Sequence, residues 1–320
     1  MNSLEHLVEL IESQSPTQVS VFAPVFNPTF LWKLSKQIAL YRRKNLEEFK
    51  VFVLKFTEGA AANFLVGECI ELQELFPQIK IYFVKSTAIT HRIKMAPGVI
   101  FMSNGIEKAF SFETEFSAFG FANEGVITSI SRSKAIDYFD ELQGEFLLRI
   151  DRDNSENILT LIEKKEEDFE AEVLEKTAAF ELSFFSAITK KIHNSGAGLN
   201  WGQPTSSRSR KDLNAAYIHV PRAIQSSAKI PGPGIIFTCK FDDGVEFEMV
   251  RTGEGGKNLT SAYENQILGR YVRHRLGVAP GTYIEEAKLQ SKNFFGLSFV
   301  PISGLNFFVK FNNSKISKLK

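Results

Sequence analysis

The order of apolar segments in the first half of the chain is the feature that most restricts its fold. Residues 19–26 (VSVFAPVF), 49–56 and 79–84 have the composition of buried strands, and segments with helical spacing, residues 29–43 and 65–76, separate them. Strands that alternate with helices in this way are typical of a mostly parallel sheet covered by helices. The sequence therefore predicts an α/β domain in this part of the chain.

The same domain is predicted to continue to about residue 146. Three shorter strand-like pieces follow the alternating segments and cover residues 99–102, 109–116 and 125–130. The string SNG at residues 103–105 is a tight-turn signal between the first two. A helix at residues 133–142 is expected to close the domain.

The second half of the chain has a different pattern of residues. Residues 151–180 are polar and strongly acidic, and we interpret them as a connector, with an exposed edge of the next domain as the alternative. From residue 181, short β-type pieces alternate with turns rich in Gly, Ser and Asn, and Asp243-Gly244 is a hairpin signal between two of them. One helix is predicted at residues 261–276. Residues 181–320 are therefore expected to form a small, mainly β, barrel-like domain, after a first domain at residues 1–150.

Composition restricts the class of protein. A chain of 320 residues is long enough for two domains with their own cores, and its two cysteines, Cys69 and Cys239, are too few for a disulfide framework or a four-thiolate zinc site. The first residues carry acids where a signal peptide has basic residues, and no apolar run approaches the roughly 20 residues of a membrane helix. We expect a soluble cytoplasmic protein without a membrane partner.

The small net charge of +1 hides an asymmetry between the two halves. Residues 191–320 hold 18 Lys and Arg against 9 Asp and Glu, a difference of +9, whereas residues 1–190 hold the remaining 20 and 28, a difference of −8. A basic part of this kind suggests a polyanionic partner, although two solvated surfaces that differ in sign give the same pattern.

Three groups of cations stand out in the basic half. Arg208, Arg210 and Lys211 lie in a Ser-rich stretch directly before a strand, and Lys257 follows a glycine-rich loop. Long cations on loops beside rigid strands suit contacts to phosphates and base edges. Arg270 and Arg273 share one face of the predicted helix, so we expect their guanidinium groups to grip a nucleic-acid backbone together, with Arg275 nearby. These groups predict DNA or RNA binding.

Two longer strings carry a family resemblance. SGAGLNWGQ at residues 195–203, followed by RKDLNAAYIHVP at residues 210–221, and RTGEGGKNLTSAYENQILGRYVRHRLGV at residues 251–278 resemble the C-terminal domain of type II restriction endonucleases of the NgoFVII family. The resemblance covers roughly residues 181–305. It implies a pseudobarrel whose two arms clasp the major groove of double-stranded DNA, and the loops around residues 201–211 and 257–258 are the candidate arms. The candidate DNA-binding residues are Asn200, Trp201, Gln203, Arg208, Arg210, Lys211, Asn214, Lys257, Asn258, Arg270 and Arg273.

The resemblance also implies a phospholipase-D-like nuclease in residues 1–150, and the strand and helix order of residues 19–146 fits that fold. Such a domain carries one H-x-K motif, then an Asn after a Gly-Ser pair, then a Glu. Two chains pair so that one histidine attacks phosphorus and the other protonates the leaving oxygen. Lys and Asn donors stabilise the developing charge, so no metal and no other cofactor is expected.

The catalytic motif departs from the family pattern. The nearest match is H-R-I-K, in which His91 and Lys94 are three residues apart instead of two, so that a bulge would be needed to bring both side chains to one face of a strand. In this alignment Asn104 and Glu115 complete the candidate catalytic set, with Asn123-Glu124 as another candidate for the acidic end. A second alignment places residues 96–102 on the H-x-K strand; His and Lys are then lost, and Glu115 stands at the Asn position.

Two functions from different classes follow. The first is a homodimeric restriction endonuclease, with a methyltransferase of the same system as a possible partner, that reads a short duplex sequence and hydrolyses phosphodiester bonds through a phosphohistidine. The second is a sequence-specific DNA-binding subunit or regulator with a degenerate nuclease domain. RNA binding is a weaker third reading, because the major groove of RNA is too narrow for a clasping pseudobarrel.

Overall fold

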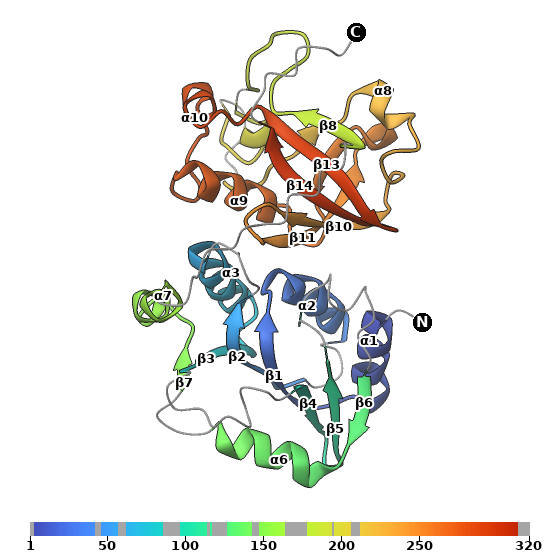
Figure 1. Ribbon diagram of the computed structural model, residues 1–320, viewed down its shortest axis with the longest axis vertical. Coiled ribbons are helices and arrows are strands. Elements are labelled where there is room, and N and C mark those ends of the chain that lie inside the picture. The colour runs from blue at the N-terminus through green and yellow to red at the C-terminus, as the bar shows by residue number, and fades with distance from the viewer. Residues whose placement is uncertain are drawn as a thin grey trace. The chain divides into compact units, whose positions relative to one another are not determined.

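The protein is described by a computed structural model in which the chain divides into two compact units, mostly residues 1–170 and mostly residues 171–320. The described residues are 3–41, 46–56, 62–85, 97–113, 116, 127–142, 147–163, 178–193, 195–205 and 212–312. Each unit is built around one sheet (Figure 1). None of the helices in the described ranges is long and apolar enough to cross a membrane.

The N-terminal unit contains a seven-stranded sheet in the order β6-β5-β4-β1-β2-β3-β7. Its strands are β1 (Gln18–Phe26), β2 (Glu48–Phe56), β3 (Ile79–Val84), β4 (Gly98–Ser103), β5 (Glu107–Phe112), β6 (Ile127–Ile130) and β7 (Leu147–Arg149). The α/β class is confirmed. The sheet is mixed, however, and the prediction of a mostly parallel sheet is wrong: only the β1–β2 and β2–β3 pairs are parallel. The other four pairs are antiparallel.

The connections between strands explain the mixed sheet. Helices α2 (Thr29–Tyr41) and α3 (Ala62–Leu75) follow β1 and β2, and a strand–helix–strand connection returns the chain in the same direction. Between β4 and β5 there is only the short turn at residues 104–106, which reverses the chain. Such a turn can join only antiparallel strands.

Both faces of this sheet are covered. On one face, Phe22 of β1 and Phe52 of β2 pack with Ala135 of α6 (Arg132–Glu141). Their neighbours along the strands, Val21 and Val51, point to the opposite face and are also fully buried. This second face is the side of the two crossover helices, α2 and α3, and α1 (Ser3–Gln14) packs beside α2.

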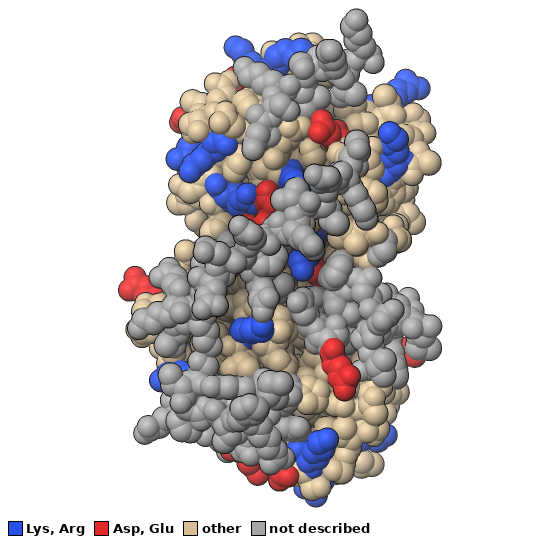
Figure 2. All heavy atoms as spheres, in the orientation of Figure 1, with Lys and Arg blue, Asp and Glu red and all other residues tan. Residues whose placement is uncertain are grey.

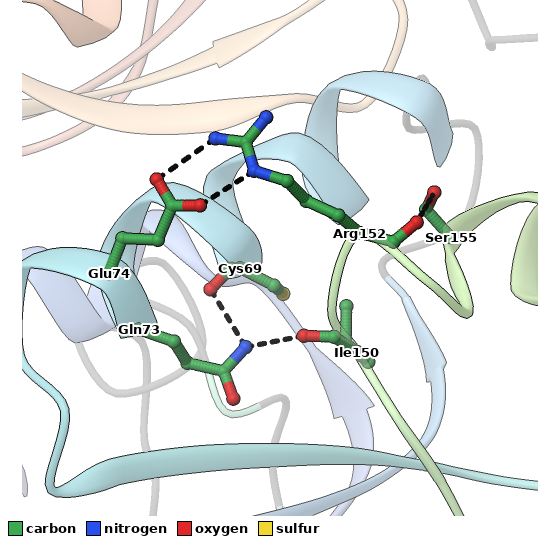
Figure 3. Close-up of polar contacts among 6 residues, drawn as sticks. All are labelled: Cys69, Gln73, Glu74, Ile150, Arg152 and Ser155. Carbon is green, nitrogen blue, oxygen red and sulfur yellow. Dashed lines mark hydrogen bonds and ion pairs between the residues drawn. The ribbon is translucent and has the colours of Figure 1, made fainter.

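The start of the predicted acidic connector belongs to the N-terminal unit. Residues 155–163 form α7 (Ser155–Glu163), which packs against α3. The buried amide of Gln73 on α3 donates to the carbonyl oxygens of Cys69 (3.1 Å) and Ile150 (2.5 Å), while its oxygen accepts from the backbone N–H of Ile81 (2.9 Å). Figure 3 shows this amide between α3 and the segment that leads to α7.

A surface ion pair adds a second link between the same segments. The Arg152 guanidinium donates to both carboxylate oxygens of Glu74, at 2.7 and 3.0 Å (Figure 3). This hydrogen bond lowers the pKa of Glu74. Because both side chains are largely exposed, the buried Gln73 amide is the stronger of the two links.

The C-terminal unit also contains seven strands, in the order β8-β13-β14-β10-β11-β12-β9. They are β8 (Phe180–Ser183), β9 (Ile218–His219), β10 (Ile236–Phe241), β11 (Glu246–Thr252), β12 (Asn258–Ser261), β13 (Gly296–Ser303) and β14 (Asn306–Asn312). The edge strands β8 and β9 lie against each other, so the sheet nearly closes on itself. This curvature is consistent with the expected pseudobarrel.

Short helices complete the C-terminal unit. They are α8 (Arg222–Gln225), α9 (Ile267–Leu276) and α10 (Glu286–Ser291), with 3₁₀ turns at Gly198–Asn200 and Glu254–Gly256. The helix expected at residues 261–276 begins only at Ile267, because Ser261 ends strand β12 and its hydroxyl accepts from the N–H of Leu268.

An aromatic core holds α9 against the sheet. Tyr271 of α9 is fully buried, and its ring lies 4.5 Å from that of Phe241 and 5.6 Å from that of Phe247, centre to centre. Arg275, one turn further on, pairs with the carboxylate of Asp242 at 2.5 Å and lies over the ring of Phe311. Arg275 is therefore part of the packing of α9 in this structure.

Candidate nucleic-acid interface

Arg273 lies inside the C-terminal unit, although its spacing with Arg270 predicted that both side chains are exposed and contact a nucleic-acid backbone. Its side chain is fully buried on α9, and its guanidinium donates to the carbonyl oxygens of Thr282 (2.7 Å), Gly269 (3.0 Å) and Leu213 (3.4 Å). Burial lowers its pKa from 12.5 to about 10. Arg270 is also buried. The two arginines are therefore part of the interior, which corrects the expectation that they contact DNA together.

Three predicted DNA-binding amides serve the same interior network. The Asn200 side chain donates to the carbonyl of Ile284 (2.9 Å) and accepts from its N–H (2.8 Å). Gln203 donates to the carbonyls of Leu213 and Gly281, and Asn214 accepts from the N–H of Gly281 (2.6 Å). These contacts fix backbone positions in the free protein, and the direct DNA contacts expected of Asn200, Gln203 and Asn214 stay a prediction.

Two glycines allow the backbones in this network to approach closely. A Cβ atom on Gly269 would lie 1.7 Å from the carbonyl oxygen of Asn214, and one on Gly202 would lie 2.0 Å from that of Asp212. No larger residue fits at either position without moving the backbone. We use the name Arg273 network for Arg273, Asn200, Gln203, Asn214 and the backbone groups that they bind.

The Arg273 network fixes both ends of the stretch that carries the first basic cluster. Gln203 lies before it and Asp212, Leu213 and Asn214 lie after it. Arg208, Arg210 and Lys211 themselves are outside the described residues. Their assignment as DNA-reading cations stays a prediction.

A second buried arginine holds the glycine-rich loop. Arg251 on β11 is 3% exposed, and its guanidinium donates to the carbonyls of Gly256 (3.0 Å), Pro231 (3.0 Å), Gly255 (3.4 Å) and Gln225 (3.4 Å). Burial lowers its pKa. Gly255 and Gly256 have φ values of 66° and 71°, which glycine adopts without the strain that a side chain would bring. Arg251 thus holds this loop in much the same way as Arg273 holds the first one.

Three candidate DNA-binding residues of the described part of the chain are not part of the buried networks. Lys257 is exposed and pairs weakly with Glu254 at 3.8 Å, and Asn258 follows it at the start of β12. Trp201 is half-buried, with its ring edge-to-face against Tyr217. Aromatic rings and cations of this kind are suited to contacts with nucleic acid, so Trp201, Lys257 and Asn258 stay candidate DNA-binding residues.

The overall charge pattern does not locate the interface by itself. On the face drawn in Figure 2, the Lys and Arg side chains of the C-terminal unit occupy several separate places instead of one continuous patch. The loops anchored by Arg273 and Arg251 are therefore a more specific indication of a binding surface than the excess of +9 found in the sequence.

Asn104 is the one member of the candidate catalytic set that lies within the described residues. His91, Lys94 and Glu115, together with Asn123-Glu124, lie outside the described residues. Asn104 is exposed in the turn after β4, where its side chain donates to the carbonyl of Gln14 and accepts from the N–H of Ile106.

The position of Asn104 separates it from the flanks of the His91 segment. Lys85 follows β3 and Pro97 precedes β4, whereas Asn104 follows the opposite end of β4. Six residues of strand span roughly 20 Å. Asn104 also uses its side-chain oxygen within the turn and its side-chain nitrogen on the carbonyl of Gln14 at the end of α1, which is the geometry of a structural residue. Its catalytic role stays a prediction.

Several residues at the candidate interface were not predicted from the sequence. Arg251 was noted only as part of the resemblance, and His193 and His219 were set aside because the five histidines have no metal-ligand spacing. Within the described ranges, no group of three or more His, Cys, Asp or Glu side chains could hold a metal ion. A histidine beside a candidate DNA-binding loop is a signal that a search for metal ligands alone does not detect.

The nearly closed sheet of the C-terminal unit is consistent with a pseudobarrel. Residues 174–299 match the family model of the NgoFVII C-terminal B3-like DNA-binding domain. The match covers less than half of the chain and includes both arginine-held loops. No significant match to a curated protein is found. The C-terminal unit is thus similar to the DNA-binding domain of a restriction enzyme, which supports sequence-specific binding of double-stranded DNA.

Proposed function

We propose that the protein is a site-specific DNA endonuclease of a restriction system. The observation that carries this proposal is the match of residues 174–299 to the NgoFVII B3-like domain, in a unit where two loops are held by buried arginines. Domains of this class are expected to read a short duplex sequence in the major groove. The C-terminal unit supplies recognition in this proposal, and the N-terminal unit supplies cleavage.

The proposed cleavage follows the route that the family resemblance implies. A histidine, His91 in this chain, attacks phosphorus and forms a phosphohistidine while the P–O bond to the leaving oxygen breaks. The histidine of a second chain protonates that oxygen, and water then hydrolyses the phosphohistidine. Lys94 stabilises the charge that develops on the phosphate oxygens. The mixed α/β sheet of the N-terminal unit is compatible with a phospholipase-D-like fold, and a homodimer would bring the two histidines together.

The second candidate function is a DNA-binding subunit or regulator without cleavage. Two observations favour it: His91 and Lys94 are three residues apart, and Asn104 lies at the other end of β4 from the flanks of the His91 segment. A chain of this kind would recognise DNA and leave cleavage to another protein.

Cleavage of a mixed-sequence plasmid in EDTA separates the two candidates. The endonuclease hypothesis predicts discrete fragments from the wild type and none from a His91→Ala variant that binds DNA with unchanged affinity. A His274→Gln variant, altered in the C-terminal unit, is the control and should cleave normally. Binding to a selected duplex without cleavage, in EDTA or in magnesium, would establish the DNA-binding subunit instead.

A further inference from the structure

Two histidines that have no part in the proposed recognition or cleavage lie beside the candidate DNA-binding loops. His219 is on β9 with its side chain exposed, whereas its neighbours Ile218 and Val220 are buried. Because side chains alternate along a strand, His219 and Tyr217 point to the same outer face. His193 lies in the segment before the 3₁₀ turn at Gly198–Asn200.

Pairing of β9 with β12 places His219 next to the loop held by Arg251. His219 is directly opposite Asn258, so their side chains leave the same face of the sheet about 5 Å apart. The N–H of Val220 donates to the carbonyl of Lys257 at 2.8 Å, which fixes the end of that loop against β9.

Contacts around Gly198 connect His193 to the segment that leads into β9. A methyl group on Gly198 would lie 3.0 Å from Cδ2 of His193, so this ring packs directly over the glycine. The carbonyl of Gly198 in turn accepts from the N–H of Tyr217 at 3.1 Å, two residues before His219. The backbone carbonyl of His193 also receives a weak hydrogen bond from Asn200.

We propose that His193, His219 and Lys257 form one anion site that binds a backbone phosphate of duplex DNA. This inference rests on the DNA binding proposed above. His219 lies opposite Asn258 beside the loop held by Arg251, and His193 packs on Gly198, so one phosphate would be contacted from both of these segments. Imidazolium and ammonium groups donate charge-assisted hydrogen bonds to phosphate oxygens, which suits this combination of residues.

The electrostatics of the free protein agree with an anion site. Although the His219 side chain reaches the surface, partial desolvation by its neighbours lowers its pKa, and the positive charges of His193 and Lys257 lower it further. Glu254 pairs with Lys257 at 3.8 Å, and Glu181 on the neighbouring strand β8 is bonded to the hydroxyl of Ser298. The charges that act on His219 are thus cationic, and a bound phosphate would offset their repulsion.

This arrangement couples DNA binding to proton uptake. A phosphate beside His219 raises its pKa above the lowered value of the free protein, so the bound complex holds more protons. Affinity is then greatest below the pKa of the free protein and is lost as pH rises through the pKa of the complex. For each unit by which binding raises the pKa of His219, the dissociation constant at low pH is tenfold smaller than at high pH. We expect the dissociation constant to change about tenfold between about pH 5.5 and about pH 8.

The test measures the dissociation constant of the full chain for a mixed-sequence duplex across that pH range at fixed salt. Wild type and the His274→Gln control should bind more weakly as pH rises. The double variant His193→Gln/His219→Gln should bind with little pH dependence and should match wild type only at the upper end of the range. Circular dichroism establishes that the variants are folded, and calorimetry in two buffers of different ionisation enthalpy measures the proton uptake directly.

The remaining outcomes overturn the inference in distinguishable ways. A double variant with the pH dependence of wild type would refute the histidine site and leave DNA binding intact. Failure of the wild type to bind duplex at any pH would refute the DNA-binding function itself. Inorganic phosphate is titrated against the histidine Cε1–H resonances as a separate arm. If phosphate shifts them while duplex affinity is indifferent to both histidines, the site binds free phosphate and the DNA-backbone assignment is wrong.

Discussion

The two loops of the candidate interface are held by buried arginines but differ in how many other bonds support them. Arg273 shares its task with the side chains of Asn200, Gln203 and Asn214, which bind backbone groups at residues 213, 281 and 284. Arg251 holds the loop at residues 253–257 with one guanidinium and depends on glycines with positive φ. Surface loops that hold cations in fixed positions need internal support. Several side chains share this support at the loop of the Arg273 network, whereas a single guanidinium provides it at the loop held by Arg251.

The difference predicts that removal of Arg273 has the largest effect on folding. Arg273→Ala removes a donor from three carbonyl oxygens, of which that of Leu213 keeps the donor from Gln203, and it opens a cavity in the interior. An acceptor left without a donor costs about 1–3 kcal/mol, and the cavity adds to this. We expect the free energy of unfolding to fall by about 3–5 kcal/mol. Urea denaturation of the variant measures it, and Lys292→Ala, an exposed residue just after α10, is the control.

A conservative variant separates charge from geometry at the same position. Arg273→Lys keeps a cation but cannot reach carbonyls on three segments with one ammonium group. It should be intermediate in stability between wild type and Arg273→Ala. Equal stability of the lysine variant and wild type would show that the network does not depend on the fork of the guanidinium.

Removal of the Arg251 guanidinium should lower the free energy of unfolding less than Arg273→Ala does, and should disturb the loop at residues 253–257 more. Arg251→Met keeps the apolar part of the side chain but removes the donors to Gly255 and Gly256, and we expect a loss of about 2 kcal/mol. Because no other side-chain amide supports this loop in the bonds described above, duplex affinity should fall in parallel. Stability and binding are measured on the same preparation. A loss larger than that of Arg273→Ala would reverse the comparison between the loops.

Close packing at Gly269 gives a smaller effect with an internal control. Gly269→Ala places a methyl group 1.7 Å from the carbonyl oxygen of Asn214, and the required backbone shift should cost about 1–3 kcal/mol. Gly67 on α3 has open space around it, so Gly67→Ala should stabilise the protein by up to about 1 kcal/mol through helix propensity. Opposite signs for the two substitutions in thermal unfolding are the expected result.

Patterns of apolar residues predicted much of the fold, because they follow from local periodicity. The strands β1, β2 and β3 and the turn at Asp243-Gly244 lie where the sequence places them. The short edge strand β7 has only three residues and carries too little periodicity to be detected. The length of the helix before Leu276 was overestimated because Ser261 pairs in β12, a contact made with a distant part of the chain.

The candidate site was harder to predict than the fold for a related reason. A charged side chain is normally exposed, so Arg270 and Arg273 at helical spacing were interpreted as a surface pair. Their burial depends on loops at residues 212–214 and 279–284 that close over α9, and the sequence alone does not show this closure. The amides of Asn200, Gln203 and Asn214 bind backbone groups at residues 213, 281 and 284, which the sequence alone does not show.

A substitution of Lys257 tests whether DNA contact at the loop of residues 253–257 is independent of the hydrogen bonds by which Arg251 stabilises that loop. Its side chain is about half exposed and its pairing with Glu254 at 3.8 Å is weak, so Lys257→Ala should leave the free energy of unfolding within about 0.5 kcal/mol of wild type. If Lys257 contacts a phosphate, the slope of log affinity against log salt should decrease in magnitude by about one unit. Lys288→Ala on α10 should leave the slope unchanged. A normal slope for Lys257→Ala, together with weak binding by Arg251→Met, would mean that Arg251 supports an interface in which Lys257 has no part.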